Sequence, residues 1–244
     1  AIGIEFSSLY NDLGVDVTLV EVLDQIMPVE DNEVSKFAER SIKKRGIKVK
    51  LKTKVTHFEK SSDQVHCTLV DSQGKEEKIT VDRVIMAAGV VGNTEDLGLE
   101  ALGVELNGSF INVDQWCKTN LVGLYAIGDV SGPPCLAHKA SHEAVMCVEK
   151  IAGVANVHAI DKNKIPGCTY GRPQVASVGM TEQQAKDAGL SFNVGRFNYQ
   201  ANGKAIAIGD NEGFVKTLFD TNTGELLGAH MIGPGVTEQI QGFG

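Results

Sequence analysis

The first 90 residues alternate between helical and strand-like patterns, and this alternation limits the possible folds more than any other feature. At the start of the chain, apolar residues recur at helical spacing, at Ile2, Phe6, Leu9 and Leu13. Gly14 follows them as a stop signal for the helix. The stretch VDVTLVE (15–21) has the period of a strand, and residues 31–45 carry a second helical pattern that ends at Gly46. Because strands joined by helices pair in parallel through right-handed crossovers, the alternation predicts a doubly wound α/β domain.

An antiparallel excursion interrupts this alternation before residue 90. IKVKLKTKV (47–55) alternates cleanly as one strand, and the strand-like VHCTLV and KITV flank the turn-like DSQGKE. RVIMAAG (83–89) is a continuous apolar run, which is typical of a buried strand.

The rest of the chain has a different character. Two short strand candidates, FINV and LYAIGD, precede a helix predicted over residues 138–152. From residue 161 onward there are short β-like runs, VASVG, GFVKTLFD and LLGAHMIG, and one helix, TEQQAKDAG, with Thr181 as its N-cap. These patterns predict an α+β segment with an antiparallel sheet, and they place domain boundaries near residues 90 and 160.

Composition excludes several classes of protein. A net charge of −8 argues against nucleic acid as the main partner, and no apolar run reaches the length of a membrane span. The five cysteines lack the spacing of a zinc site and suggest no disulfide framework, which fits a reducing compartment. The basic stretch from Lys36 to Lys54 is interpreted as a solvated face of a helix and a strand.

A possible dinucleotide site lies at the start of the chain. Gly3 opens the first helix and Glu21 closes the next strand, as in a fingerprint whose N–H groups bind a pyrophosphate and whose acid binds ribose hydroxyls. Because a carboxylate repels a 2′-phosphate, Glu21 favours NAD over NADP. The alternative is that Gly3 only permits close packing of helix and strand, and that Glu21 is a solvated strand end.

Two further candidates lie in the middle of the chain. Asp129 follows an apolar strand candidate, where open α/β sheets bind ligands, although an acid there also serves as a turn former or helix cap. Residues 136–138 begin a helix whose backbone N–H groups suit a partially negative group. His138 and His142 have the i, i+4 spacing of metal ligands, but without a third ligand a helix surface or a cofactor contact is favoured.

Six segments resemble, in order and spacing, the flavin-dependent pyridine nucleotide-disulfide oxidoreductases: AIGIEF, VTLVE, AAGVVGNTEDLGLE, LYAIGDVSG, LAHKA and PQVASVGMTEQQAKDAG. The resemblance covers nearly the whole chain. It implies an α/β architecture in three parts: a Rossmann-like NAD domain with an antiparallel excursion (1–90), a central FAD-contacting domain (91–160) and part of an α+β antiparallel interface domain (161–244).

The resemblance implies an NAD site at the start of the chain. The end of its phosphate-binding motif is matched by Ala1, Ile2, Gly3, Ile4 and Glu5. Gly3 is then the third glycine of the motif, Glu21 binds the NAD ribose, and Val55 contacts the adenine through its backbone. Gly89 lies beside the nicotinamide half of NAD. Glu5 also matches an acid that pairs with a lysine near the flavin; alternatively, it only favours the helix N-terminus electrostatically.

The resemblance also implies half of an FAD site. Asp129 matches the acid that holds the ribityl chain of FAD. The turn whose N–H groups face the flavin pyrimidine ring is matched by Cys135, Leu136, Ala137 and His138.

The implied activity is oxidation of dihydrolipoamide in 2-oxoacid dehydrogenase or glycine cleavage complexes, with electrons passing through FAD to NAD. The implied partners are a second copy of the chain, in a homodimer, and the lipoyl-bearing acyltransferase component of a 2-oxoacid dehydrogenase complex. The implied compartment is a bacterial cytoplasm or a mitochondrial matrix. Two alternatives stay open: a related reductase of glutathione or mercuric ion, and a non-catalytic dimerisation and docking module.

The family's catalytic groups have no counterpart in this sequence. Neither the redox-active cysteine pair nor the C-terminal His and Glu acid/base pair is found among the 244 residues. We therefore expect no catalytic residue in the chain and no turnover by it alone. We expect it to be an internal part of a longer flavoenzyme.

Overall fold

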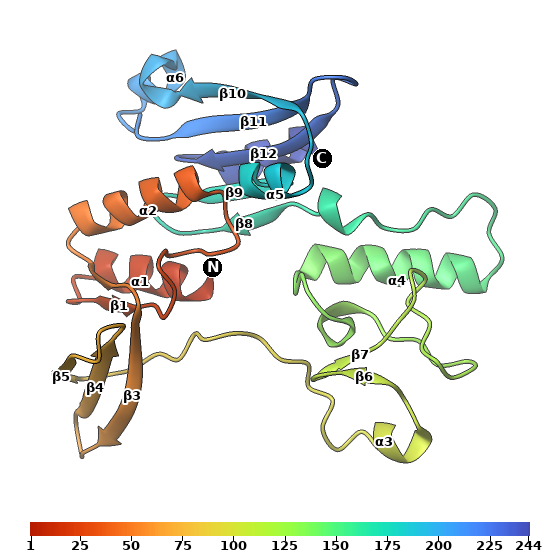
Figure 1. The fold of residues 1–244 in the computed structure, drawn as a ribbon, viewed down its shortest axis with the longest axis horizontal. Helices are drawn as coiled ribbons and strands as arrows, with labels where there is room; N and C mark the ends of the chain where they lie inside the picture. Colours follow the sequence, from red (N-terminus) through yellow and green to blue (C-terminus); the bar gives the residue numbers. More distant parts are fainter. The chain divides into compact units, whose positions relative to one another are not determined.

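The computed structural model describes residues 1–244, and their contacts group them into two compact units (Figure 1). Residues 1–87 and 166–244 form the first unit, and residues 88–165 form the second. Most of the first expected domain and most of the last thus share one unit. The domain boundaries near residues 90 and 160 stay a prediction.

The first unit begins with the predicted order of helix, strand, helix and strand. The elements are α1 (Ile2–Asp12), β1 (Thr18–Val20), α2 (Asn32–Lys44) and β2 (Lys48–Lys50). β1 and β2 pair in parallel, with Leu19 opposite Val49. Asp31 caps α2, because its carboxylate accepts the Glu33 N–H at 3.0 Å. This parallel pair with a helical crossover confirms the α/β class.

The antiparallel excursion is also confirmed. Its three strands are β3 (Thr53–Lys60), β4 (Val65–Asp71) and β5 (Glu76–Val81), paired in that order. The single strand expected over residues 47–55 is wrong, because Lys52 has a φ of 50° and separates β2 from β3. The break allows the chain to leave the parallel pair and enter a second sheet.

The buried strand expected over residues 83–89 is also wrong. These residues lie outside every strand, and Val84, Ile85 and Met86 are exposed. A strand needs a neighbour to complete its backbone hydrogen bonds, and none of the four sheets in residues 1–244 contains this run. Apolar composition alone therefore does not make it a strand here.

Helix α1 has its apolar stripe on the outside. The exposed residues of the stripe are Ile2, Phe6, Leu9 and Leu13. The buried face is instead formed by Ile4, Ser7 and Ser8. The Ser8 hydroxyl accepts the N–H of Arg172 at 2.8 Å, so the buried face of α1 forms a polar contact with the C-terminal part of the first unit.

Residues 166–244 form a five-stranded antiparallel sheet, which confirms the α+β prediction for this segment (Figure 1). The strand order is β10-β11-β12-β9-β8. The strands are β8 (Gly167–Thr169), β9 (Val175–Gly179), β10 (Phe192–Asn198), β11 (Phe214–Asp220) and β12 (Leu226–Ile232). The short helices between and after them are α5 (Glu182–Asp187), α6 (Gly203–Ala207) and α7 (Val236–Gln239).

One hydrophobic core joins the two parts of the first unit. Its members are Ile4, Ile26, Met27, Val34, Ala38, Ile42 and Ile47 from the N-terminal part and Val175, Phe214 and Ile232 from the sheet. Phe37 of α2 adds an edge-to-face contact with Phe214, with 5.6 Å between the ring centroids. The core against which α2 packs is therefore built from residues far apart in the sequence.

A buried ion cluster also connects the two parts. The Lys216 ammonium on β11 lies 3.0 Å from Asp31, 2.9 Å from Glu33 and 2.6 Å from Glu182. The side chains of Lys216 and Asp31 are only 1% and 2% exposed. Burial acts to lower the pKa of Lys216, but hydrogen bonds to the three carboxylates outweigh it and raise the pKa to about 12. The cluster fixes the N-terminus of α2 to β11 and α5.

Thr181 caps α5 as the sequence predicts, and its removal has a measurable cost. Its hydroxyl accepts the Gln184 N–H at 3.2 Å, and the Gln184 side chain accepts the Thr181 N–H at 2.8 Å. We expect Thr181→Ala to lower the free energy of unfolding in urea by about 1 kcal/mol. Thr181→Ser retains the hydroxyl and is the control. Equal losses in both variants would show that the capping bond contributes nothing.

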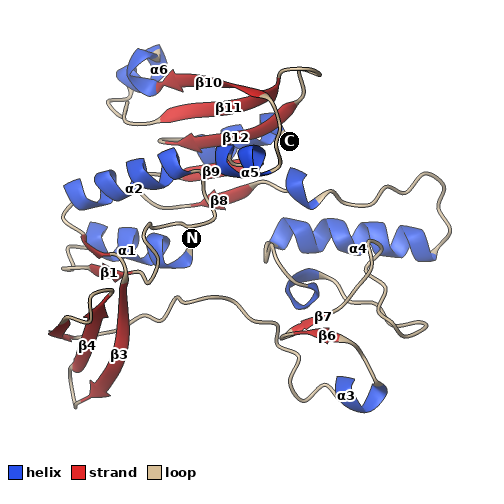
Figure 2. Ribbon diagram, viewed as in Figure 1, coloured by secondary structure: helices blue, strands red, loops and turns tan.

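The second unit has one long helix and much irregular structure (Figure 2). Its elements are α3 (Leu99–Leu102), β6 (Leu106–Asn107), β7 (Phe110–Ile111), the 3₁₀ turn η1 (Gly128–Ser131) and α4 (Ala137–Ile151). FINV thus contributes to a short hairpin, and the helix expected over 138–152 is confirmed. The strand expected over LYAIGD is wrong: it makes one isolated bridge, from Tyr125 to Lys118, before the chain turns at Gly128 with a φ of 74°.

Candidate functional site

Helix α1 begins directly after Ala1, as the predicted NAD site requires. The Ala1 carbonyl accepts the N–H groups of Ile4 and Glu5. A Cβ added to Gly3 would lie 3.6 Å from the Ala87 Cβ and 3.9 Å from the Leu19 Cδ1, which are ordinary van der Waals contacts. Packing of helix and strand therefore does not by itself require glycine here. A role toward NAD stays a prediction for residues 1–5.

Glu21 lies at the carboxyl end of β1, with its side chain held in place. Its Oε1 accepts the Leu23 N–H at 2.9 Å, while Oε2 has no hydrogen bond within the chain. Its backbone carbonyl accepts the Thr53 N–H at 3.0 Å, which joins Glu21 to the first residue of β3. Val55 lies two residues further along that strand, beside a β-bulge. The structure thus brings the predicted ribose and adenine contacts, Glu21 and Val55, into one neighbourhood.

The other two predicted contacts on the NAD side have different surroundings. The Glu5 carboxylate accepts the Tyr170 N–H at 2.8 Å, so it binds the segment that leads into the antiparallel sheet. Gly89 has a φ of 77°, which favours glycine, but it belongs to the second unit. Its position relative to Glu21 and Val55 therefore stays a prediction.

The residues predicted to contact FAD gather in the second unit. Asp129 is exposed in η1, and the segment from Cys135 to His138 leads into α4. Burial raises the pKa of the Cys135 thiol, and the Asp129 carboxylate raises it further. Lys139 of α4 donates to the Gly128 and Gly132 carbonyls on either side of Asp129, which places the turn carrying Asp129 against the start of the helix. Helix α4 starts at Ala137, and Leu136 supplies no side-chain cap to its first turn. One face therefore presents a carboxylate next to the N-terminus of a long helix.

A buried ion pair lies behind this face. Lys139 and Glu143 are i, i+4 on α4, with 3.2 Å between Nζ and Oε1, and their side chains are 0% and 8% exposed. The pair is not predicted from the sequence, although the i, i+4 spacing is visible in KASHE. Lys and Glu on a helix are usually solvated, so nothing in the sequence indicates that these two lie inside.

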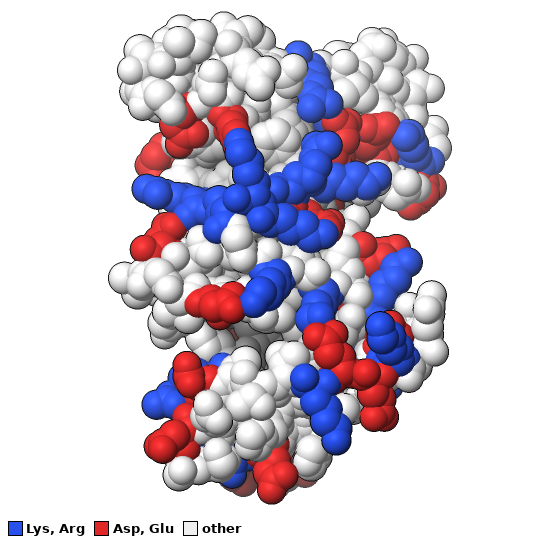
Figure 3. All heavy atoms as spheres, turned by 90° about the vertical axis from the view of Figure 1, so that its left-hand side faces the viewer, with Lys and Arg blue, Asp and Glu red and all other residues white.

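The basic stretch from Lys36 to Lys54 is largely neutralised by neighbouring acids. Figure 3 shows Lys and Arg side chains in a band on one face, with acidic side chains around them. The ion pairs are Lys43–Glu39, Lys44–Glu212, Arg45–Asp12, Lys48–Asp16 and Lys50–Glu77. These pairs favour the solvated, salt-bridged interpretation over a patch for a polyanion.

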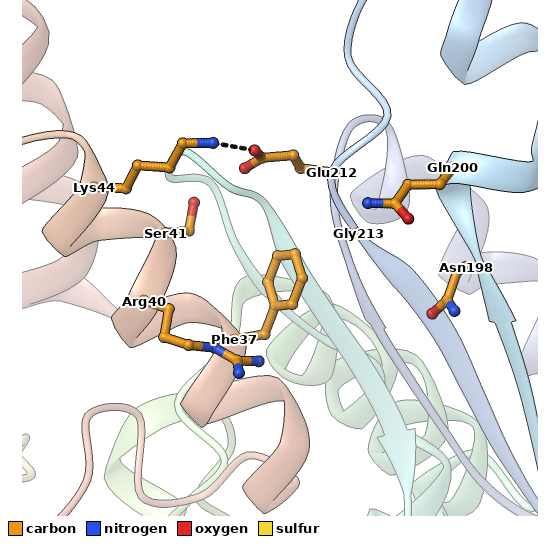
Figure 4. A pocket seen from close by; sticks show the side chains of 8 residues that line it. All are labelled: Phe37, Arg40, Ser41, Lys44, Asn198, Gln200, Glu212 and Gly213. Carbon is orange, nitrogen blue, oxygen red and sulfur yellow. Dashed lines mark hydrogen bonds and ion pairs between the residues drawn. The ribbon is translucent and has the colours of Figure 1, made fainter.

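A pocket of about 300 Å³ lies between α2 and the sheet of the first unit (Figure 4). It is lined by Phe37, Arg40, Ser41, Lys44, Asn198, Gln200, Glu212 and Gly213. Figure 4 shows the Lys44–Glu212 ion pair spanning it. None of the predicted NAD or FAD contacts lines this pocket, but Glu5 lines a second pocket of about 800 Å³ together with Ser8 and Tyr170. No group of three or more His, Cys, Asp or Glu residues is arranged to hold a metal ion.

Comparison with known proteins shows the family. Residues 1–144 match the family model described as pyridine nucleotide-disulphide oxidoreductase, and residues 165–244 match the dimerisation domain of the same family. The chain belongs to the pyridine nucleotide-disulphide oxidoreductases. The resemblance inferred from the sequence motifs is thereby confirmed, and members of this family use FAD and NAD.

The most similar relatives include two bacterial proteins named dihydrolipoyl dehydrogenase. The protein of Rhizobium etli is 58% identical over 243 residues, and that of Zymomonas mobilis is 49% identical over 243 residues. Both alignments cover 100% of this chain but only 50% and 52% of the relatives, so the chain spans about half of their length.

Solved structures give the same fold. LpdA from Mycobacterium tuberculosis superposes with a TM-score of 0.90 at 27% identity, over 99% of this chain and 52% of that one. The flavoprotein disulfide reductase RclA from Escherichia coli also reaches a TM-score of 0.90, at 24% identity, and shares the fold. That alignment covers 99% of this chain and 54% of RclA. No helix of the structure is long and apolar enough to cross a membrane.

The residues present fit both cofactors of the family. In the first unit, the Glu21 carboxylate is oriented by Leu23 and retains a free oxygen that suits a ribose diol. In the second unit, hydrogen bonds from Lys139 hold the turn carrying Asp129 against the start of α4, where N–H groups suit a partially negative ring edge.

Proposed function

We propose that this chain holds NAD and FAD within a dihydrolipoyl dehydrogenase, an enzyme that oxidises protein-bound dihydrolipoamide. The observation that carries the proposal is the 58% identity over 243 residues to a protein of that name. The carboxylates of Glu21, which is half-buried, and of Asp129, which is exposed, support it, because the resemblance assigns the first to the NAD ribose and the second to the ribityl chain of FAD.

In this proposal the chain contributes binding and orientation rather than bond chemistry. Bound FAD would supply the redox chemistry, since a flavin can accept an electron pair from a dithiol and donate a hydride to NAD. Glu21 accepts hydrogen bonds from the adenosine ribose, and the N–H groups that open α1 bind the pyrophosphate. Asp129 accepts from the ribityl hydroxyls of FAD, and the first turn of α4 faces the flavin ring. Such positioning lowers the barrier by removing the entropic cost of bringing the reactants together.

The proposed partners follow from the second matched region. Residues 165–244 match a dimerisation domain, which supports a homodimer formed through the antiparallel sheet. The proposed second partner is the lipoyl-bearing acyltransferase component of a 2-oxoacid dehydrogenase complex, in a bacterial cytoplasm or a mitochondrial matrix.

The activity is tested on the product of the complete reading frame that encodes residues 1–244. We expect NAD reduction by dihydrolipoamide, with little activity toward glutathione disulfide or mercuric ion. Binding to a lipoyl-bearing acyltransferase without any turnover would support a docking module instead. Turnover only with NADPH and glutathione disulfide would reassign the substrate.

Glu21→Gln isolates the charge of the proposed ribose contact. The amide oxygen still accepts the Leu23 N–H, so the local geometry is retained while the negative charge is lost. We expect the KM for NAD to rise about tenfold with little change in kcat, because the charged acceptor of the ribose hydroxyls is lost. A tenfold change corresponds to about 1.4 kcal/mol of binding energy. The preference for NAD over NADP should also fall. Glu59→Gln makes the same change in charge near the far end of β3 and should leave both values unchanged.

A further inference from the structure

We infer that Lys139 and Glu143 are positioning residues for FAD, which hold the turn carrying Asp129 against the helix that starts at Ala137. The inference rests on the proposed FAD site and extends it, because both side chains lie beneath the exposed residues of that site.

The contacts of the pair are directed at the backbone on both sides of Asp129. The Lys139 ammonium donates to the Gly128 carbonyl at 2.9 Å and to the Gly132 carbonyl at 2.8 Å. Glu143 Oε2 accepts the Gly128 N–H at 2.8 Å. The turn is therefore held at both of its ends, while Asp129 between them is left exposed.

Ser131 completes the network. Its hydroxyl lies 2.8 Å from the Gly128 carbonyl, 3.1 Å from Lys139 Nζ and 3.3 Å from Glu143 Oε2. Neither Lys139 nor Glu143 has a buried polar atom without a partner. A buried network in which every polar group is satisfied fixes a single arrangement of its members.

The backbone of the turn lies very close to α4. A Cβ on Gly128 would lie 3.2 Å from the Ala140 Cβ, which is tighter than most such contacts, and the φ of 74° at Gly128 also favours glycine. There is little space between the turn and the helix at Gly128. The position of Asp129 in the turn therefore depends on the position of α4.

Stability alone does not account for the pair. Removing two charges from water is costly, and replacing a buried ion pair by apolar residues of similar volume is often neutral or stabilising. An apolar pair would also fill the space beneath the turn, but it offers no hydrogen bonds to the Gly128 and Gly132 backbone. What the ion pair adds is orientation of the turn relative to the N-terminus of α4.

Two charge-neutral double variants of the complete gene product test the inference. Lys139→Met with Glu143→Leu removes every hydrogen bond from these two side chains to the turn, whereas Lys139→Met with Glu143→Gln retains an acceptor for the Gly128 N–H. We expect the dissociation constant of FAD, measured by flavin fluorescence on titrating apoprotein, to rise about a hundredfold in the first and about tenfold in the second. Circular dichroism and thermal unfolding verify that each variant is folded.

The control makes the same two substitutions at exposed positions of the same helix. Lys150→Met with Glu149→Leu should leave FAD affinity unchanged. If the Glu143→Leu double variant folds and binds FAD within twofold of the wild type, the inference is wrong. If that variant does not fold, unchanged affinity in the Glu143→Gln double variant contradicts it equally. Absence of FAD binding by the wild type would instead reject the proposed function, and the inference with it.

Discussion

Lys216→Met is expected to lower the free energy of unfolding by about 3–5 kcal/mol, the typical cost of removing one partner from a buried ion pair. The Lys216 ammonium lies within 3.0 Å of Asp31, Glu33 and Glu182, and its side chain is 1% exposed. Methionine fills a similar volume but leaves three carboxylates facing one another. Because these acids come from both parts of the first unit, their repulsion separates α2 from the antiparallel sheet.

The loss should depend on pH in a defined direction. In the wild type, burial acts to raise the pKa of Asp31, but hydrogen bonds from Lys216 and from the N–H groups of Glu33 and Glu182 outweigh it and lower the pKa. That contribution to stability is present above the ordinary pKa of an aspartate and is lost as the pH falls through the lowered value. Without Lys216, burial dominates and the pKa of Asp31 rises. The folded variant then binds a proton more readily than the unfolded chain, so its deficit should be smaller at pH 5 than at pH 8.

Lys186→Met is the matched control for Lys216→Met. Lys186 binds the same acid, Glu182, at 2.6 Å, but its side chain is 57% exposed. An exposed i, i+4 pair contributes about 0.3–0.5 kcal/mol. Urea unfolding of both variants at the two pH values separates burial from charge. A loss at Lys216 no larger than at Lys186 would show that the cluster is not the main connection between the two parts.

Local patterns predict much of the fold because they follow from chemistry within a few residues. Asp31 and Thr181 are recognised as helix starts since a short polar side chain there accepts the N–H groups of the next turn. The patterns VHCTLV and KITV likewise predict β4 and β5, and three strands of the antiparallel sheet, β9, β11 and β12, are predicted correctly, whereas β8 and β10 are not predicted. The class of fold and the family are therefore accessible from sequence.

The errors arise where a distant segment decides the outcome. RVIMAAG has the composition of a strand, but a strand also needs a neighbour, and none is present beside it. The face of α1 that is buried includes Ser8, whose hydroxyl accepts the N–H of Arg172, 164 residues further along the chain, while the apolar stripe is exposed. Lys139, Glu143 and Lys216 look like surface residues until their partners are known. At the candidate site, the motifs predict roles for Glu21 and Asp129, but nothing in the sequence indicates the buried charges behind Asp129.

Gly228→Ala is expected to lower the free energy of unfolding nearly as much as Lys216→Met. A Cβ at this position of β12 would lie 2.1 Å from the Met180 carbonyl oxygen and 3.0 Å from the Met180 nitrogen. Backbone atoms cannot rotate away as a side chain does, so β12 and the end of β9 must separate. Movement of Met180 also disturbs the 2.8 Å bond that its carbonyl accepts from His230 Nε2. We expect a loss of about 3 kcal/mol, at the upper end of the usual cost of overpacking.

Gly203→Ala is the control for Gly228→Ala, because it adds the same methyl group in open space. No atom lies within 4 Å of a Cβ at Gly203, at the start of α6. Alanine there should be neutral or stabilising by up to about 1 kcal/mol, because it restricts the unfolded chain and favours the helix. Both variants add one methyl group, against backbone atoms at Gly228 and in open space at Gly203, so urea unfolding compares the close approach with an open site. Similar urea midpoints would mean that β12 and β9 can separate at Gly228 without loss of stability. A large difference would establish that Gly228 is required by backbone contact with Met180, a requirement that no local pattern in LLGAHMIG reveals.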